Sequence, residues 1–325
     1  MVTRDCSATG VDATLVGTRR GEAVDKGVAV VIPCHDEAAT IATVITDFRR
    51  ALPGARIVVV DNASSDDTAM QARSAGALVV TESRKGKGYA LLRGFRCVQD
   101  AEYIVMVDGD DTYPAEDVGK LLAALDGGAD MAIGTRLVTF DEGAFRPHHG
   151  AGNRIFILLI RLLFGVRTRD LFSGYRVLTQ RFVETSPLIA QGFEVETELS
   201  IQALAHGFNV VEVPVHYRAR HEGSNSKLHT YRDGYRILLA LLAFFRDYRP
   251  LTFFGALGLV FFAASVASGS VVVAQYLHTG AILRVPLAIL SVGLALLGAV
   301  SVIGGLILSS ISRRTSQLAA LISRR

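Results

Sequence analysis

The chain has 325 residues, of which 50% are hydrophobic and 20% charged, and its formal net charge at pH 7 is +3. This length allows one large core or two domains. The nearly balanced charge lacks the strongly basic character of nucleic-acid-binding chains, so we expect no nucleic-acid partner.

The first part of the chain predicts an alternating α/β pattern behind a loose tail. Residues 1–26 are polar, contain glycine and carry charges of both signs, which is typical of an N-terminal tail. Strands are predicted at 28–33, 56–61, 77–81, 103–107 and 131–134, and helices at 38–50, 67–75, 88–98 and 114–125. Successive strand–helix units with short loops predict an α/β fold with a mostly parallel, Rossmann-like sheet.

The second half is less regular. Helices are predicted at 153–164 and 194–206, a strand at 210–217, and an amphipathic helix at 231–245. The apolar side of that last helix carries Tyr235, Leu238, Leu239, Leu242 and Phe245. The helix either lies in a membrane interface or packs on the α/β domain, and the sequence leaves both alternatives open.

Two runs near the C-terminus, 251–277 and 285–311, contain no charged residue. Each exceeds the roughly 20 residues that cross a bilayer as a helix, so we predict a transmembrane hairpin rather than the buried hairpin of a soluble protein. Arginines flank the hairpin at Arg236, Arg246 and Arg249 before it and at Arg313, Arg314, Arg324 and Arg325 after it, whereas the connecting loop carries only Arg284. The positive-inside rule therefore places both termini in the cytoplasm.

These patterns divide the chain into five predicted parts. They are a flexible tail (1–26), an α/β domain (27–228), a juxtamembrane amphipathic helix (229–250), the membrane hairpin (251–311) and a basic cytoplasmic tail (312–325). Gly304 and Gly305, with scattered alanines and serines, would let membrane helices approach closely. The sequence therefore allows a homo-oligomer but does not determine the oligomeric state.

Acidic residues follow the fourth predicted strand. Asp108, Asp110 and Asp111 come directly after the apolar run 103–107. Carboxylates at the carboxyl end of a parallel strand lie where open α/β sheets bind ligands. Oxygen-rich groups of this kind hold Mg²⁺ or Mn²⁺ against phosphates, although an acidic turn that ends a strand has the same composition.

Further acids and a basic turn follow the earlier strands. Asp36 and Glu37 end the first strand without a G-x-G-x-x-G turn, and Asp61 ends the second. Carboxylates there can accept hydrogen bonds from a ribose or a base. After the third strand, Lys85 and Lys87 alternate with glycines, which suits a diphosphate at the start of the next helix or else forms a solvated basic turn.

Taken together, these motifs resemble family-2 glycosyltransferases of the GT-A fold, and most closely the membrane-anchored polyprenyl-phosphate glycosyltransferases related to dolichyl-phosphate mannose synthase. The matching segments are 31–37, 61–66, 85–88, 108–110, 134–136, 173–176 and 193–198. The likeness covers about residues 28–227. The order and spacing of the set make it more specific than any one motif.

The resemblance implies roles for individual residues. Donor-binding residues would be Pro33, Asp36, Glu37, Asp61, Lys85, Lys87, Asp108 and Gly109. Asp108 and Asp110 would bind Mg²⁺ or Mn²⁺, and the catalytic set would be Asp110, Arg136 and Arg176. Thr112 stands where related synthases often have Gln, so the third metal ligand is open between Asp111, Thr112 and water.

Acceptor chemistry points to cations later in the chain. A phosphomonoester is close to dianionic at neutral pH, with a second pKa of about 6, and is already a nucleophile. The site must then hold the phosphate in line with arginine forks while a metal neutralises the leaving diphosphate. The candidates are Arg136, Arg176, Arg218, Arg220 and Lys227, and the acids Asp170, Glu194 and Glu196 are candidates to position sugar hydroxyls or the arginines.

The sequence-level hypothesis is an inverting, metal-dependent transfer of one sugar from a nucleotide-sugar to a polyprenyl phosphate at the cytoplasmic membrane face. A family-2 enzyme with another lipid or glycan acceptor is the nearest alternative. Residues 108–112 also fit the D-x-D-x-T signature of haloacid-dehalogenase-like phosphatases, but the match follows the fourth strand instead of the first. The charge-free spans disfavour a transporter component, because intramembrane charge commonly marks a translocation path.

Overall fold

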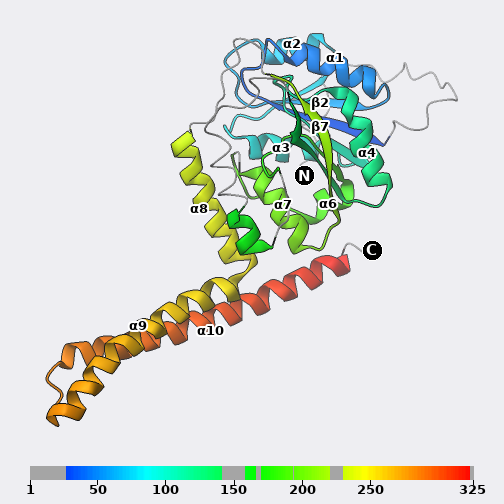
Figure 1. Ribbon diagram of the computed structural model, residues 1–325. Helices are drawn as coiled ribbons and strands as arrows, with labels where there is room; N and C mark the ends of the chain where they lie inside the picture. The colour runs from blue at the N-terminus through cyan, green and yellow to red at the C-terminus, as the bar shows by residue number, and fades with distance from the viewer. Residues whose placement is uncertain (1–26, 141–157, 166–169, 193, 220–229, 323–325) are drawn as a thin grey trace. The chain divides into compact units, whose positions relative to one another are not determined.

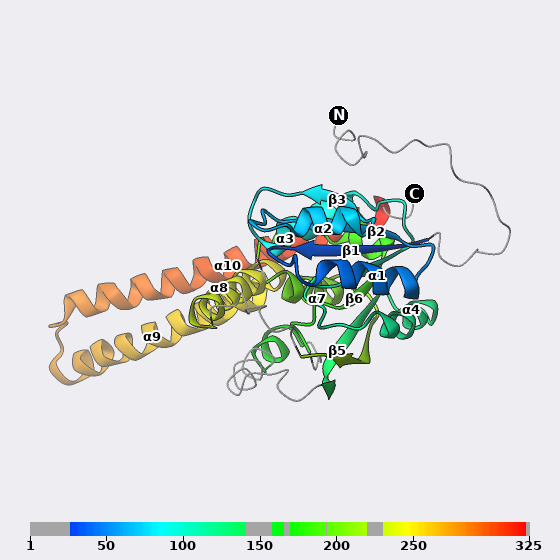
Figure 2. The ribbon, with the colours of Figure 1, turned by 90° about the horizontal axis from the view of Figure 1, so that it is seen from above.

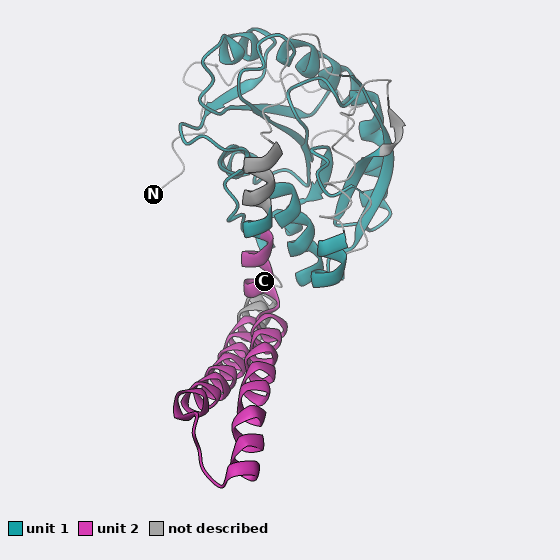
Figure 3. Ribbon diagram, turned by 60° about the vertical axis from the view of Figure 1, so that its left-hand side comes forward, with its two compact units in different colours: residues 1–240 teal, residues 241–325 magenta. Residues whose placement is uncertain are grey.

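The computed structural model describes residues 27–140, 158–165, 170–192, 194–219 and 230–322. The chain forms two compact units, residues 1–240 and residues 241–325, which are coloured separately in Figure 3. The limit between them falls inside a helix, α8 (Thr230–Tyr248).

The first unit is an α/β domain whose elements follow the predicted order closely. Its strands are β1 (Val28–Cys34), β2 (Arg56–Asp61), β3 (Leu78–Thr81), β4 (Tyr103–Met106), β5 (Met131–Phe140), β6 (Arg176–Thr179) and β7 (Val210–Tyr217). Its helices are α1 (Ile41–Ala51), α2 (Thr68–Ser74), α3 (Lys87–Arg96), η1 (Ala115–Asp117), α4 (Val118–Asp126), α6 (Gln180–Thr185) and α7 (Val195–Ala205). Residues 158–164 are also helical, and the start of the helix predicted at 153–164 lies outside the described residues.

The seven strands form one sheet in the order β3-β2-β1-β4-β6-β5-β7. Neighbouring strands pair in parallel except at β6, which is antiparallel to both β4 and β5. The predicted mostly parallel α/β fold is therefore confirmed. The strand β6 was missed because four residues that begin with an arginine carry too short an apolar pattern to stand out.

Alternating side chains of the strands fill two core layers, one on each face of the sheet. In β1, Val30 and Ile32 belong to one layer and Ala29 and Val31 to the other, and all four are at most 1% exposed. The first layer receives side chains from α1, α2 and α4, and the second from α3, α6 and α7. Figure 1 shows α1 and α7 on opposite sides of the sheet, and Figure 2 shows α1 alongside β1.

The parallel direction of the strands determines where loops meet. The carboxyl ends of β1, β2, β3 and β4 lie at one edge of the sheet, because these strands pair in parallel register. The antiparallel β6 starts at this same edge, with Arg176 opposite Met106 at the end of β4. Residues from distant parts of the sequence therefore gather there.

The second unit is a helical hairpin. Helices α9 (Pro250–Thr279) and α10 (Val285–Ile322) contain two segments, Pro250–Thr279 and Val285–Ser312, that are long and apolar enough to cross a membrane. A Cβ on Gly258 would lie 2.8 Å from Val302 Cγ2, so the two helices approach closely at this point. Few side chains of these segments are buried within the protein, so most of their apolar surface is exposed.

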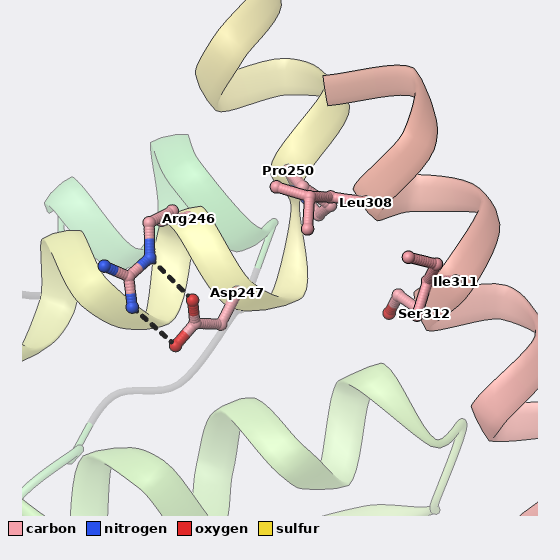
Figure 4. A pocket seen from close by; sticks show the side chains of 6 residues that line it. All are labelled: Arg246, Asp247, Pro250, Leu308, Ile311 and Ser312. Atoms are coloured by element: carbon pink, nitrogen blue, oxygen red, sulfur yellow. Dashed lines mark hydrogen bonds and ion pairs between the residues drawn. The ribbon is translucent and has the colours of Figure 1, made fainter. Parts of the chain in front are cut away.

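A cavity of about 460 Å³ lies among residues from α8, α9 and α10 of this second unit. Figure 4 shows the Arg246 guanidinium facing the Asp247 carboxylate, with N–O distances of 2.7 and 3.2 Å. The rest of the lining comes from Pro250, Leu308, Ile311 and Ser312. The polar wall of the cavity is therefore a compensated ion pair at the ends of the two apolar segments.

Candidate active site

The loop after β4 is held in place by the start of α1. Thr40 Oγ1 donates a hydrogen bond of 2.6 Å to the carbonyl oxygen of Gly109. A Cβ on Gly109 would lie 2.6 Å from Cys34 Sγ, so this position requires glycine. Beside it, Asp110 Oδ1 accepts a 2.6 Å hydrogen bond from Thr112 Oγ1. The acidic loop is thus pinned by contacts with its own residues and with a neighbouring loop.

Asp111 is paired with an arginine from a distant part of the chain. Its φ of 58° is a left-handed backbone conformation, which non-glycine residues adopt rarely. Its Oδ1 lies 3.2 Å from the Arg218 guanidinium, which also reaches Glu116 at 3.4 Å. Burial raises the pKa of Asp111, although Arg218 opposes that shift. Asp111 serves to anchor Arg218 in this structure.

Lys87, the first residue of α3, connects the acidic loop with α7. Its Nζ lies 2.5 Å from Asp108 Oδ1 and 2.5 Å from Glu196 Oε1. Burial alone would lower the pKa of Lys87, but the two carboxylates outweigh burial and raise it above its ordinary value. The ammonium therefore stays charged between two acids that the sequence places far apart.

The two glycines beside Lys87 have a different role from the one predicted. A Cβ on Gly88 would lie 1.9 Å from the carbonyl oxygen of Ala190, and one on Gly86 would lie 2.1 Å from that of Gln191. The Gly88 amide donates to Gln191 O at 3.1 Å. Both glycines therefore admit the backbone of residues 190–191, and the binding of a diphosphate by Lys85 and Lys87 stays a prediction.

The loops after β1 and β2 are bonded to each other. Asp36, with a φ of 52°, accepts a 2.6 Å hydrogen bond from the Ser65 amide, and its own amide donates to Ser64 Oγ at 3.1 Å. The Glu37 amide donates to Thr68 Oγ1 at 2.8 Å. The Asp61 carboxylate closes its own loop instead, by accepting from the Ser64 amide at 3.3 Å. The predicted donor-binding acids Asp36, Glu37 and Asp61 therefore share one bonded edge, next to Pro33 in β1.

Asn62 is a residue of this region for which the sequence predicted no individual role. Its side-chain amide donates to Glu82 O at 3.1 Å and to Arg84 O at 2.7 Å, and its Oδ1 accepts from the Gly86 amide at 2.7 Å. It thereby fixes the loop that carries the exposed Lys85. The feature of the sequence that could have indicated a role for Asn62 is its position directly after Asp61, at the end of a strand.

The segment 170–176 reaches the acidic loop through Gly174. A Cβ on Gly174 would lie 2.3 Å from Asp108 Oδ2, so the carboxylate packs against the bare Cα. The Gly174 amide donates to the hydroxyl of Tyr113 at 3.1 Å, and Ser173 Oγ donates to Gly134 O at 2.5 Å. Sequence reasoning missed Tyr113, since an aromatic residue after an acidic turn is indistinguishable from a packing residue.

Arg136 is paired bidentately with a fully buried acid. Its Nε and Nη2 lie 2.8 and 2.7 Å from the two carboxylate oxygens of Asp170, which is 0% exposed. Burial disfavours the charged guanidinium, but Tyr113 and Asp170 hold the pKa of Arg136 well above its ordinary value. The Arg136 side chain keeps 16% exposure at the sheet edge.

Arg176 lies in the interior and not at the site surface. The residue is 0% exposed, and its guanidinium donates to Leu171 O, Ser173 O and Ser200 Oγ at 2.8 to 3.0 Å. Burial lowers the pKa of Arg176 to about 10. Direct contact with a lipid phosphate, which the sequence predicted, is incompatible with this placement.

The remaining predicted residues are placed as follows. Glu194 accepts hydrogen bonds from the Gln191 and Gly192 amides at 3.3 and 3.1 Å, so it organises its own loop. Arg220 and Lys227 lie outside the described residues. Of the five cations predicted for the acceptor, Arg136 and Arg218 are described at the sheet edge with part of the side chain exposed.

The acidic loop fits a divalent metal with the help of a substrate. Within the part of the chain that the structure describes, no three His, Cys, Asp or Glu side chains are grouped closely enough to hold a metal by themselves. Asp108 and Asp110 provide two carboxylates from one loop, and the Asp108 side chain is 27% exposed. Mg²⁺ is commonly bound by one or two carboxylates together with substrate phosphates, which matches this donor set.

Comparison with known proteins agrees with this geometry. Residues 29–185 match the family described as glycosyl transferase family 2. Over 242 residues the chain is 37% identical to glycosyltransferase AglJ of Haloferax volcanii, which covers 74% of the chain and 78% of that protein. It is 31% identical over 206 residues to a dolichyl-phosphate hexose transferase of the same organism, covering 63% and 88%. It is also 31% identical over 211 residues to a polyprenol monophosphomannose synthase of Mycolicibacterium smegmatis, covering 60% and 78%.

Solved structures share the fold. Glucosyl-3-phosphoglycerate synthase of Mycobacterium tuberculosis, crystallised with Mn²⁺, UDP and phosphoglyceric acid, superposes with a TM-score of 0.56 at 22% identity. The match covers 68% of this chain and 78% of that one. The same synthase was also crystallised with Mg²⁺ and UDP, again with a TM-score of 0.56. At this identity the likeness supports the GT-A-like arrangement of the sheet.

Proposed function

The chain belongs to glycosyltransferase family 2, and we propose that it transfers a single sugar from a nucleotide-diphosphate sugar to a polyprenyl phosphate at the cytoplasmic face of a membrane. The observation that carries this proposal is the pair of relatives whose names specify such acceptors, a dolichyl-phosphate hexose transferase and a polyprenol monophosphomannose synthase. Both cover at least 60% of the chain at 31% identity. Because the chain belongs to this family, we no longer consider residues 108–112 as the signature of a haloacid-dehalogenase-like phosphatase.

The helices after the α/β domain support a lipid acceptor. Two apolar segments could anchor the chain in a bilayer. In α8, Leu238, Leu239 and Leu242 are 37%, 47% and 43% exposed, which suits a helix that lies in a lipid interface. An enzyme whose acceptor carries a polyprenyl chain must work at such an interface, because the chain stays in the hydrocarbon.

On the donor side, we assign Asp108 and Asp110 to a Mg²⁺ or Mn²⁺ ion. Such an ion, when bound, neutralises charge on the leaving diphosphate. Lys87 lies 2.5 Å from Asp108, so its ammonium is already beside the place where the diphosphate would bind. We assign nucleoside contacts to the edge formed by Asp36, Glu37 and Asp61, and Lys85 to the outer rim of the same loop region.

On the acceptor side, we assign the phosphate to Arg136 and Arg218. Both guanidiniums are held by carboxylates, Asp170 and Asp111, so each is oriented before the acceptor arrives. A phosphate oxygen forms a bond to the anomeric carbon while the bond from that carbon to the diphosphate oxygen breaks. The leaving nucleoside diphosphate takes the electron pair, no proton moves, and a single in-line displacement inverts the anomeric configuration.

The direct test is transfer by the purified full-length protein in lipid with a panel of nucleotide sugars and Mg²⁺ or Mn²⁺. Polyprenyl phosphate, unphosphorylated polyprenol and a glycan acceptor are offered separately. We expect a lipid-linked sugar and free nucleoside diphosphate only with the phosphate. Transfer to the glycan or to the free alcohol, with none to the phosphate, would establish the alternative acceptor class instead.

Asp110→Asn tests the metal assignment. Replacing a carboxylate by an amide of the same shape removes the charge that a hard cation requires, so transfer should fall by roughly 100-fold or more while membrane integration is unchanged. Asp100→Asn is the matched control, because Asp100 pairs with Arg56 at an exposed position. Wild-type turnover in the Asp110→Asn protein would remove the assignment.

A further inference from the structure

The buried side chain of Arg176 touches two segments that are distant in the sequence. Its Nε donates to Ser173 O at 3.0 Å and its Nη2 to Leu171 O at 2.8 Å, so one side of the guanidinium holds the segment 170–174. Its Nη1 donates to Ser200 Oγ at 3.0 Å, and Ser200 belongs to α7. A planar guanidinium fixes the separation of its partners, because its donors cannot move independently.

The segment 170–174 carries contacts to both substrates of the proposed reaction. Asp170 holds Arg136 bidentately, on the side assigned to the acceptor. Four residues later, Gly174 packs its Cα against the Asp108 carboxylate, on the side assigned to the donor. A displacement of this short segment would therefore disturb both sides together.

Helix α7 carries the other contact to the donor side. Ser200 Oγ donates to the carbonyl oxygen of Glu196 at 3.1 Å, one helical turn earlier. The Glu196 carboxylate is 2.5 Å from Lys87, which is also 2.5 Å from Asp108. Because Arg176 is bonded to Ser200, its side chain helps determine where α7 presents Glu196.

The charged residues around Arg176 form two groups of ion pairs. Lys87 pairs with Asp108 and Glu196, and Arg136 pairs with Asp170. One acid of each group, Glu196 and Asp170, favours the charged form of Arg176. A buried charge is costly unless opposite charges are near, so removing the central cation would leave both neighbouring acids less well compensated.

We propose that Arg176 is a positioning residue that couples the donor and acceptor sides of the site, an inference that rests on the proposed function. It touches neither substrate. Its hydrogen bonds to Leu171, Ser173 and Ser200 hold the segment 170–174 against α7, and this keeps Asp108, Lys87 and Arg136 in a fixed arrangement relative to one another. Lysine could keep the charge but has no rigid fork with which to hold both segments.

The first test does not depend on catalysis. Amide hydrogen exchange is measured on the full-length protein in lipid for wild type, Arg176→Lys and Arg176→Met. We expect faster exchange in both 170–175 and 195–203 in the two variants, with 28–34 unchanged. The control is Arg181→Met, because Arg181 is 67% exposed and pairs with Asp130 away from these segments. Faster exchange in only one of the segments, or in neither, overturns the proposal.

The second test measures coupling between the two sides. Asp170→Asn and Glu196→Gln are made singly and together, in wild type and in Arg176→Lys. In wild type the losses in kcat/KM should deviate from additivity by about tenfold, as residues of one hydrogen-bond or ion-pair network do. In Arg176→Lys they should become additive.

The outcomes separate the two hypotheses. Additive losses in wild type, or equal non-additivity in Arg176→Lys, overturn the coupling role. If wild type transfers no sugar to polyprenyl phosphate, the proposed acceptor fails instead, and the exchange measurement still decides whether Arg176 joins the two segments. Should Arg176→Met not fold, Arg176→Lys keeps both tests decisive, since it retains the buried charge.

Discussion

At the scale of single residues, the site depends on glycines that leave room for a neighbouring side chain or for backbone. Gly109 lies against Cys34, Gly174 against Asp108, and Gly88 against the carbonyl of Ala190. None of these three has the positive φ that usually explains a required glycine. Their common reason is close approach, which explains why a side chain at any of them would move a neighbouring group.

Gly174→Ala tests this explanation at the metal loop. The new Cβ would lie 2.3 Å from Asp108 Oδ2, and the flexible carboxylate should move while the backbone stays. We expect kcat/KM to fall by about 100-fold, as displacement of a catalytic group by about 1 Å commonly costs, with an unchanged thermal midpoint. Gly119→Ala is the control, since a Cβ there meets nothing within 4 Å. Equal activity in the two variants would contradict the explanation.

Glu82 gives a prediction about pH. The Arg84 guanidinium binds both of its carboxylate oxygens at 2.9 Å and, with burial opposing, lowers the pKa of Glu82 to about 2. Because the folded pKa lies below the unfolded value of about 4.5, the stabilisation is complete above about pH 5. It is lost as the pH falls from about 4.5 towards 2.

Glu82→Gln should therefore lower the thermal midpoint by about 2–4 °C at pH 7, a modest effect because water surrounds Arg84. The difference from wild type should shrink steadily below pH 5, as measured by circular dichroism of the full-length protein in detergent. Glu184→Gln, at an exposed position in α6, is the comparison. A difference that stays constant down to pH 3 would show that the ion pair does not act as described.

At the scale of elements, the hairpin of α9 and α10 is held by small residues at its contacts. Besides the Gly258 contact, a Cβ on Gly298 would lie 3.1 Å from the Gly258 carbonyl oxygen. Ser265 Oγ donates to Ser291 O at 2.6 Å. Close backbone approach with an interhelical hydrogen bond is a typical way for membrane helices to associate.

Gly258→Leu should loosen this hairpin. Its Cβ would lie 3.0 Å from the Gly298 carbonyl oxygen, which is backbone and cannot rotate away, so we expect about 1–3 kcal/mol of destabilisation. The measurement is the thermal midpoint in nanodiscs. Gly255→Leu, one turn earlier with nothing within 4 Å of its Cβ, should leave the midpoint close to wild type. If the two variants behave alike, these helices do not pack at Gly258 in a bilayer.

At the scale of the whole molecule, the proposed orientation is open to a labelling test. Arginines flank both ends of the hairpin, and Arg284 alone lies in the connecting loop, which predicts an external loop. A membrane-impermeant maleimide applied to intact cells should label Ala281→Cys but not Lys120→Cys, whose side chain is exposed on the α/β domain. Labelling of the unsubstituted protein gives the background from its native cysteines. Labelling of Lys120→Cys alone would reverse the orientation.

The sequence was sufficient for features that depend on neighbouring residues. Asp108 and Asp110 were predicted to follow a strand because they come directly after an apolar run, and they do follow β4. The strand β7 was predicted at its observed limits because its pattern is local. Arg176 was placed wrongly because its environment depends on β6, which pairs between β4 and β5 in antiparallel register. These pairings join residues 43 to 76 positions apart in the sequence, and no local pattern indicates them.

The sequence by itself determined the α/β class, the apolar hairpin and the acids at the strand ends. Each of these follows from local periodicity or from a residue's position after a strand, and the parallel sheet then brings such ends to one edge. Only the tertiary structure decided the partners: Lys87 with Asp108 and Glu196, Arg136 with Asp170, and Arg176 in the interior. The physical reason is that buried charges take the partners that the packed fold brings near them.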